Sequence, residues 1–208
     1  MAAAARRLAA EGLVLGTAGN VSARAGELVA VTATGAVLAE LEPDHVVVVD
    51  LEGNAVHGDY APTSEIELHL GAYRRHQVGA VVHAHSPIGT ALACVLDELP
   101  LIHYQMLALG GPIRVAPYAT FGTSELARLT LDALEGRAAA LMANHGMIAV
   151  GPDLGAAVEN GLLLEWACEL YWRAAAVGRP RTLDAGQAQD FIDAITARGY
   201  GTLQERDG

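Results

Sequence analysis

The chain has 208 residues, of which 52% are hydrophobic and 18% are charged, and its formal net charge is −11. This length and this hydrophobic content allow a sizeable core and argue against a disordered chain. The acidic balance, without a basic stripe along the sequence, argues against nucleic acid as a partner.

The N-terminal third is expected to form one helix followed by short antiparallel strands. Alanine-rich residues 2–11 favour a helix that ends at Gly12. Between this helix and the first strand, the segment Gly16–Ser22 combines two glycines with hydroxyl side chains. It fits either an ordinary loop or a nest of backbone amides that binds a phosphate. Apolar runs separated by turn residues then predict strands at 21–24, 28–32, 45–50 and 55–57.

A helix from Ser64 to about His76 is the next predicted element. Ser64 followed by Glu67 fits a capping box, and the hydroxyls of Thr63 and Ser64 next to helix amides favour an anion. Glu65 in the first turn suits either a helix-dipole partner or a functional carboxylate. His69 and His76 are both expected to be exposed.

Two histidines at the end of an apolar run are the strongest chemical signal in the chain. Residues 78–82 are apolar and include three β-branched valines, and His83-Ala84-His85 follows directly. Side chains alternate along a strand, so His83 and His85 point to the same face. Pro87 ends the strand, which places both imidazoles at a strand end. Such a pair suits a divalent metal, although two edge histidines with hydrogen-bond partners would give the same pattern.

The second half of the chain continues the alternation of helices and strands. Helices are predicted at 88–96, 124–134, 153–177 and 183–199, an extended piece at 101–104, and strands at 138–142 and 147–150. His145 follows the first of these strands, so a third histidine lies where a strand meets a loop. Trp166 and Trp172 fit core or interface packing.

Features of the whole chain favour a single domain, residues 1–208, in the cytoplasm. No apolar run is long enough to span a membrane, and the N-terminus lacks the apolar core of a signal peptide. The two cysteines, Cys94 and Cys168, lie in apolar helical contexts and are expected to be buried free thiols. That use of cysteine fits a reducing compartment.

Taken together, the motifs resemble the class II aldolase/adducin family, and within it the aldolases that act on L-fuculose 1-phosphate. The motifs follow the family's order over nearly the whole chain: residues 16–22, 34–35, 64–65, 83–85, 102–104, 116–123, 145–146 and 200–201. The sequence departs from the family's pattern in three places. It has Thr63-Ser64 where two serines are common, Ala143-Asn144 where the aldolase has Gln-His, and a short N-terminus.

The resemblance implies a fold and a reaction. The fold is α/β, with three α/β/α layers around a mainly antiparallel sheet, in a homotetramer with active sites at subunit interfaces. The reaction is the reversible cleavage of a ketose 1-phosphate, such as L-fuculose 1-phosphate, to dihydroxyacetone phosphate and an aldehyde such as lactaldehyde. The cofactor is Zn²⁺, with Mn²⁺ or Co²⁺ as alternatives. The sequence contains no lysine, which excludes a Schiff-base aldolase.

The resemblance also assigns roles to residues of this chain. Four metal ligands are implied: Glu65, His83, His85 and His145. Glu65 would leave the metal when substrate binds and then move the proton at the enediolate carbon. Tyr104 and Tyr200 match positions that donate to the aldehyde oxygen, and Phe121 matches an aromatic of the aldehyde pocket. The phosphate would be bound by Gly19, Asn20, Thr34, Gly35, Thr63 and Ser64.

Other members of the family are alternatives. A methylthioribulose-1-phosphate dehydratase keeps a histidine-rich zinc site, and decarboxylases also belong to the family. A ribulose-phosphate 4-epimerase is expected to have aspartate where Glu65 stands. A non-catalytic adducin-like module would lose the metal ligands that this chain keeps.

Overall fold

A computed structural model describes residues 1–198, which form a nine-stranded sheet flanked by helices. The strand order is β4-β3-β2-β1-β5-β9-β8-β7-β6. The strands are β1 (Asn20–Ala25), β2 (Leu28–Thr32), β3 (Val46–Asp50), β4 (Ala55–His57), β5 (Ala80–Ala84), β6 (Glu98–Leu99), β7 (Ile113–Ala116), β8 (Ala139–Met142) and β9 (Gly146–Gly151). Neighbouring strands pair antiparallel, apart from the parallel pair β7–β8.

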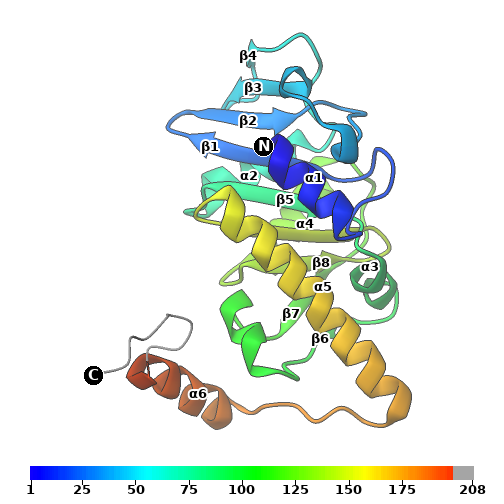
Figure 1. The fold of residues 1–208 in the computed structure, drawn as a ribbon, viewed down its shortest axis with the longest axis vertical. Coiled ribbons are helices and arrows are strands. Elements are labelled where there is room, and N and C mark those ends of the chain that lie inside the picture. Colours follow the sequence, from blue (N-terminus) through cyan, green and yellow to red (C-terminus); the bar gives the residue numbers. More distant parts are fainter. Residues whose placement is uncertain (199–208) are drawn as a thin grey trace, which may run out of the picture.

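The helices complete three layers. They are α1 (Ala2–Ala10), α2 (Ile66–Arg75), α3 (Pro87–Ala93), α4 (Ser124–Leu134), α5 (Leu154–Val177) and α6 (Ala185–Arg198), with 3-10 turns η1 (Leu38–Glu40), η2 (Pro43–His45) and η3 (Tyr104–Leu109). α1, α3 and α5 pack on one face of the sheet, and α2 and α4 pack on the other (Figure 1). α6 lies apart from the sheet and contacts η3. The expected α/β/α layers and mainly antiparallel sheet are confirmed.

Alternation along β5 decides where the histidine pair points. Ala80, Val82 and Ala84 join the core under α1, α3 and α5, whereas Val81 joins the core under α2 and α4. His83 is two residues after Val81 and therefore faces the α2 side. It lies opposite Asn20 of β1 and Ile148 of β9 in the sheet. A site built on His83 is therefore enclosed between the sheet and the start of α2.

The start of α2 differs from the predicted one. The helix begins at Ile66 with Glu65 at the cap position, and the side chain of Ser64 is exposed, so the capping box is wrong. The hydroxyl of Thr63 instead accepts a hydrogen bond from the amide of Glu65 at 3.3 Å. Ser64 does not cap the helix here, because Glu65 occupies the cap position with its carboxylate turned toward the histidines of the sheet.

The cysteine prediction is half wrong. Both thiols are free, but only Cys168 is buried, whereas Cys94 at the end of α3 is exposed. α3 ends at Ala93, so the expected helix through residue 96 does not continue over Cys94. Within residues 1–198, no helix combines the length and the apolar character that crossing a membrane requires.

Candidate metal centre and anion pocket

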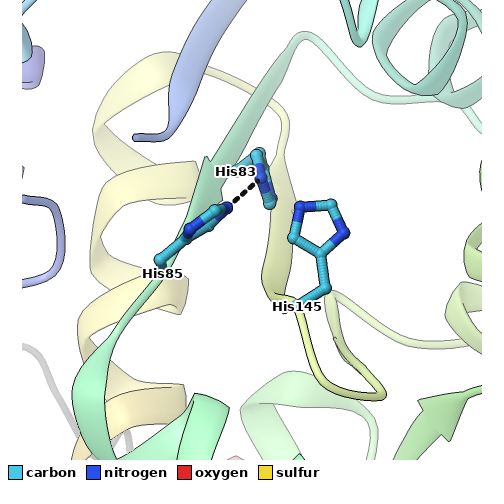
Figure 2. A group of neighbouring side chains, drawn as sticks. All are labelled: His83, His85 and His145. Carbon is cyan, nitrogen blue, oxygen red and sulfur yellow. Dashed lines mark hydrogen bonds between the residues drawn. The ribbon is translucent and has the colours of Figure 1, made fainter. Parts of the chain in front are cut away.

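Three imidazoles converge at the middle of the sheet. His83 lies near the end of β5, His85 directly follows that strand, and His145 directly precedes β9 (Figure 2). One ligand atom from each side chain can be chosen so that all three lie within 4.8 Å of one another. The three ring centroids are each 4.9 Å apart. β5 and β9 are adjacent antiparallel strands, so the sheet itself brings these residues together.

A tight turn and a glycine let the third histidine approach the pair. Met142 of β8 pairs with Gly146 of β9, and the turn between them contains Asn144, whose φ of 55° lies in the left-handed region. Asn tolerates that conformation better than most residues. A Cβ on Gly146 would lie 2.5 Å from the carbonyl oxygen of Ala84 and 2.9 Å from Cδ2 of His85. Only glycine therefore lets the turn lie this close to β5.

Glu65 reaches the same point from the start of α2. Its Oε2 is 3.1 Å from Nε2 of His83, and its Oε1 is 3.4 Å from Nε2 of His145. Nδ1 of His83 lies 2.8 Å from the carbonyl oxygen of Met147, so this nitrogen carries the hydrogen and Nε2 does not need one. That Nε2 is also only 3.0 Å from Nε2 of His85.

These groups fit a metal cation. Imidazole lone pairs and a carboxylate so close together repel one another unless a cation lies among them. Oε1 of Glu65 is buried and has no hydrogen-bond partner among the described residues. Three histidines with one carboxylate are the donor set of an open, catalytic zinc site, unlike the cysteine-rich structural kind. His83, His85, His145 and Glu65 can therefore hold a divalent ion.

The protonation states suit metal binding. Burial, with the neighbouring His83 and His145, lowers the pKa of His85 to about 4, and burial also lowers the pKa of His145. Both imidazoles are then neutral at pH 7, as metal ligands must be. Burial acts to raise the pKa of Glu65, but its contacts with His83, Asn20 and His145 outweigh burial and hold that pKa well below its usual range. Glu65 is therefore ionised.

A row of buried polar side chains supports Glu65. Nδ2 of Asn20 donates to Oε2 of Glu65 at 3.0 Å, and Oδ1 of Asn20 is 2.6 Å from Nε2 of His69. Ser22 lies 2.6 Å from both Nδ1 of His69 and the hydroxyl of Tyr73. The expectation that His69 is exposed is wrong, because its exposed fraction is 0%. The signal was available: Glu65, His69 and Tyr73 recur every four residues on α2, so they share one helix face.

A cavity of about 300 Å³ opens in front of the histidines. Its lining includes Glu65, His85 and His145, and His83 lies fully buried behind them. All six residues predicted to bind phosphate also line it: Gly19, Asn20, Thr34, Gly35, Thr63 and Ser64. Phe121 and the unpredicted Tyr118 line it as well, and both are largely exposed.

The anion side of the cavity is made of two loops that are joined by backbone hydrogen bonds. The amide of Thr34 donates to the carbonyl of Ala61 at 3.0 Å, and the amide of Thr63 donates to that of Thr32 at 3.1 Å. These bonds place the hydroxyls of Thr34, Thr63 and Ser64 at one cavity. Gly19 completes it at a φ of 86°, where a Cβ would lie 2.9 Å from the carbonyl oxygen of His83. The described lining has hydroxyls and glycines and, besides histidine, no basic side chain.

Of the two predicted tyrosines, Tyr104 does not line this cavity within the described residues of one subunit. Tyr104 begins η3, where its ring lies 4.3 Å from those of His103 and Phe191, and it lines a different cavity beside α6. The extended piece predicted at 101–104 thus leads into a 3-10 turn. Tyr200 lies outside the described residues. The catalytic roles of both tyrosines stay predictions.

Comparison with known proteins decides the family. Residues 1–172 match the family described as class II aldolase and adducin N-terminal domain. The chain belongs to the class II aldolase and adducin family. The resemblance inferred from the sequence is therefore confirmed, as is the expected class of enzyme.

Individual relatives within the class II aldolase family are similar over most of this chain. A 5-methylthioribulose-1-phosphate/5-deoxyribulose-1-phosphate aldolase from Rhodospirillum rubrum is 42% identical, covering 94% of this chain and 89% of that protein. L-fuculose phosphate aldolase from Escherichia coli K12 is 39% identical, covering 81% of this chain and 79% of that protein. A solved L-fuculose 1-phosphate aldolase superposes with a TM-score of 0.89 at 35% identity, covering 94% of this chain and 93% of that one.

Proposed function

We propose that this protein is a zinc-dependent aldolase that reversibly cleaves a ketose 1-phosphate to dihydroxyacetone phosphate and an aldehyde. The observation that carries the proposal is one cavity in which His85, His145 and Glu65, with His83 buried behind them, meet the loops of Thr34 and Ser64. A phosphate on those loops would hold the carbon skeleton of the substrate against the histidines. Family membership supports the same reaction class.

The reaction moves one proton while one carbon–carbon bond breaks. The hydroxyl at C4 loses its proton and becomes the aldehyde, and the electron pair of the C3–C4 bond stays on the three-carbon fragment. A divalent ion supplies a Lewis acid that stabilises this negative charge. Glu65 is ionised and enclosed at the cavity wall, so in the condensation direction it is the base that takes the proton from C3; in cleavage it must first take up a proton, which it then returns to C3. Tyr104 or Tyr200 is proposed to act at the aldehyde oxygen.

The relatives' substrates narrow the choice of ketose. Their names specify 5-methylthioribulose 1-phosphate, 5-deoxyribulose 1-phosphate and L-fuculose phosphate. We favour a 5-deoxypentulose or 5-methylthiopentulose 1-phosphate, since the relative at 42% identity covers more of this chain than the fuculose enzyme. Phe121 and Tyr118 at the cavity give an apolar surface for a methyl or methylthio group.

A panel of substrates tests the reaction and the substrate class. The zinc-loaded protein is incubated with dihydroxyacetone phosphate and, in separate reactions, acetaldehyde, methylthioacetaldehyde or lactaldehyde. We expect new ketose phosphates from all three, with the highest kcat/KM for an aldehyde without a hydroxyl. If lactaldehyde is preferred, the substrate class is wrong; if no aldehyde condenses, the proposed function is wrong.

Ser64 tests the phosphate site. Its side chain is exposed at the cavity and makes no capping bond within the described structure, so its loss should leave the fold intact. We expect Ser64→Ala to raise KM for the ketose phosphate by about 10-fold, the cost of one hydrogen bond to a charged group. Metal content should not change. Ser124→Ala, at the exposed start of α4, is the control.

A wild-type KM for Ser64→Ala would show that the phosphate lies elsewhere. Asn20 is less suited to this test. In the described structure its amide is occupied by Glu65 and His69, so a change there would alter more than the phosphate site.

The assembly and location belong to the same proposal. The cavity is open, and Tyr104 lies away from it in one subunit, which fits a homotetramer whose sites are completed at subunit interfaces. Large apolar side chains such as Leu15, Val95 and Trp172 are exposed on one subunit and suit interface packing. A cytoplasmic location agrees with the two free thiols.

A further inference from the structure

The hydrogen bonds behind Glu65 form a continuous buried chain. Glu65, Asn20, His69, Ser22 and Tyr73 are each at most 8% exposed. Consecutive members are joined at 3.0, 2.6, 2.6 and 2.6 Å. These hydrogen bonds connect one face of the α2 segment to one face of β1, because residues four apart on a helix share a face, as do residues two apart on a strand.

Each hydrogen bond in this buried series has only one possible assignment of donor and acceptor. The ionised Glu65 only accepts, so Asn20 turns its NH₂ toward Glu65 and its oxygen toward His69. That oxygen also only accepts, so Nε2 of His69 must carry the hydrogen. Burial and the nearby His83 lower the pKa of His69 to about 3, so the imidazole has a single hydrogen.

The remaining bonds follow from that single hydrogen. Nδ1 of His69 carries none and accepts from the hydroxyl of Ser22, whose oxygen in turn accepts from Tyr73. Every bond then has one donor and one acceptor. The opposite tautomer of His69 would place two acceptors, Nε2 and Oδ1 of Asn20, 2.6 Å apart.

We propose that His69 is a positioning residue for the proton transfer: through its Nε2–H it holds the amide of Asn20 with the nitrogen toward Glu65 and so sets the orientation of that carboxylate. The inference rests on the proposed aldolase function, because it assigns to Glu65 the proton at C3. Without the hydrogen bond from His69, the bond to Glu65 alone would fix the Asn20 amide, so both the amide and the carboxylate would be held less firmly. His69 touches neither the metal ligands' nitrogens nor the cavity.

Kinetics on matched variants test the proposal. Leucine at position 69 fills a similar space without a donor, whereas glutamine restores one. We expect His69→Leu to lower kcat by about 10- to 100-fold, the range for outer partners of a metal site. KM for the ketose phosphate should stay within about twofold, and metal content should be unchanged. His69→Gln should recover most of the lost kcat.

Tyr73→Phe is the control. It removes the far end of the chain but keeps the bonds among His69, Asn20 and Glu65, so kcat should remain near that of the wild type. If the buried hydrogen bonds served only to hold α2 on β1, losing the Tyr73 hydroxyl would be as harmful as His69→Leu, and that result would overturn the proposal. A wild-type kcat for His69→Leu would overturn it as well.

An NMR measurement on the unaltered protein keeps the test independent of activity and of folding of the variants. Nitrogen-15 shifts of the His69 imidazole should show a neutral ring protonated at Nε2. A ring protonated at Nδ1 would refute the inference, since the Asn20 amide would then be reversed. The two proposals fail differently. If the aldolase function is wrong, the wild type cleaves no ketose phosphate. If only this inference is wrong, the wild type is active, but His69 is protonated at Nδ1 or His69→Leu keeps the wild-type kcat.

Discussion

Glu65→Gln is expected to lower carbon–carbon cleavage by about 10² to 10⁴, the usual contribution of a general acid–base group. Glutamine has the size of glutamate but no useful basicity. The three histidines remain, so the variant should keep some metal. The partial reaction is the sharper measurement: wild-type protein should exchange one methylene hydrogen of dihydroxyacetone phosphate for deuterium without any aldehyde, and Glu65→Gln should not.

Glu67→Gln is the matched control, because Glu67 lies two residues further on α2 and is exposed. It should exchange deuterium at the wild-type rate. If metal-loaded Glu65→Gln does so too, then Glu65 is not the base, and its contacts with His83 and His145 serve metal binding alone.

Removing the metal should abolish activity. We expect about one divalent ion per purified chain, most of it zinc by elemental analysis, and cleavage should fall to the uncatalysed level after chelation. Activity should return when Zn²⁺ is added. His85→Ala takes away one of three converging imidazoles, so its metal content should fall well below that of the wild type.

His57→Ala provides the control for histidine loss. His57 is exposed on the edge strand β4, away from the described metal cluster, so metal content and activity should be those of the wild type. Full activity in wild-type protein that contains no metal would contradict both the metal centre and the proposed reaction.

The parts of the site that the sequence predicted are those governed by local periodicity. The alternation along the strand predicted that His83 and His85 point to the same face, and their rings do lie together, with centroids 4.9 Å apart. The apolar run at 138–142 predicted that His145 lies where a strand meets a loop, and His145 directly precedes β9. The loops of Thr34 and Ser64 line one cavity because of backbone pairings such as that of Thr34 with Ala61. Local sequence patterns do not predict such pairings, so this part of the site was predicted from the family resemblance alone.

The sequence-based predictions that proved wrong are mainly those in which tertiary contacts override a local preference. Ser64 has good capping chemistry, yet Glu65 takes the cap position because its carboxylate is held by His83 and Asn20. His69 was expected to be exposed as a polar helix residue, but its partners come from β1, far away in the sequence. Cys94 is exposed at the C-terminal cap of α3, which ends at Ala93 and not at the predicted residue 96.

The origin of the four metal-centre residues has a consequence for how the protein matures. The four residues lie before α2 (Glu65), at the end of β5 and just after it (His83 and His85), and before β9 (His145). Long-range sheet pairing brings β5 and β9 together, and such pairing forms slowly. During synthesis, the centre lacks its last donor, His145, until β9 has left the ribosome and joined β5. A nascent chain would therefore present at most Glu65, His83 and His85 to cellular metal, and tight, selective capture would be among the last events of folding.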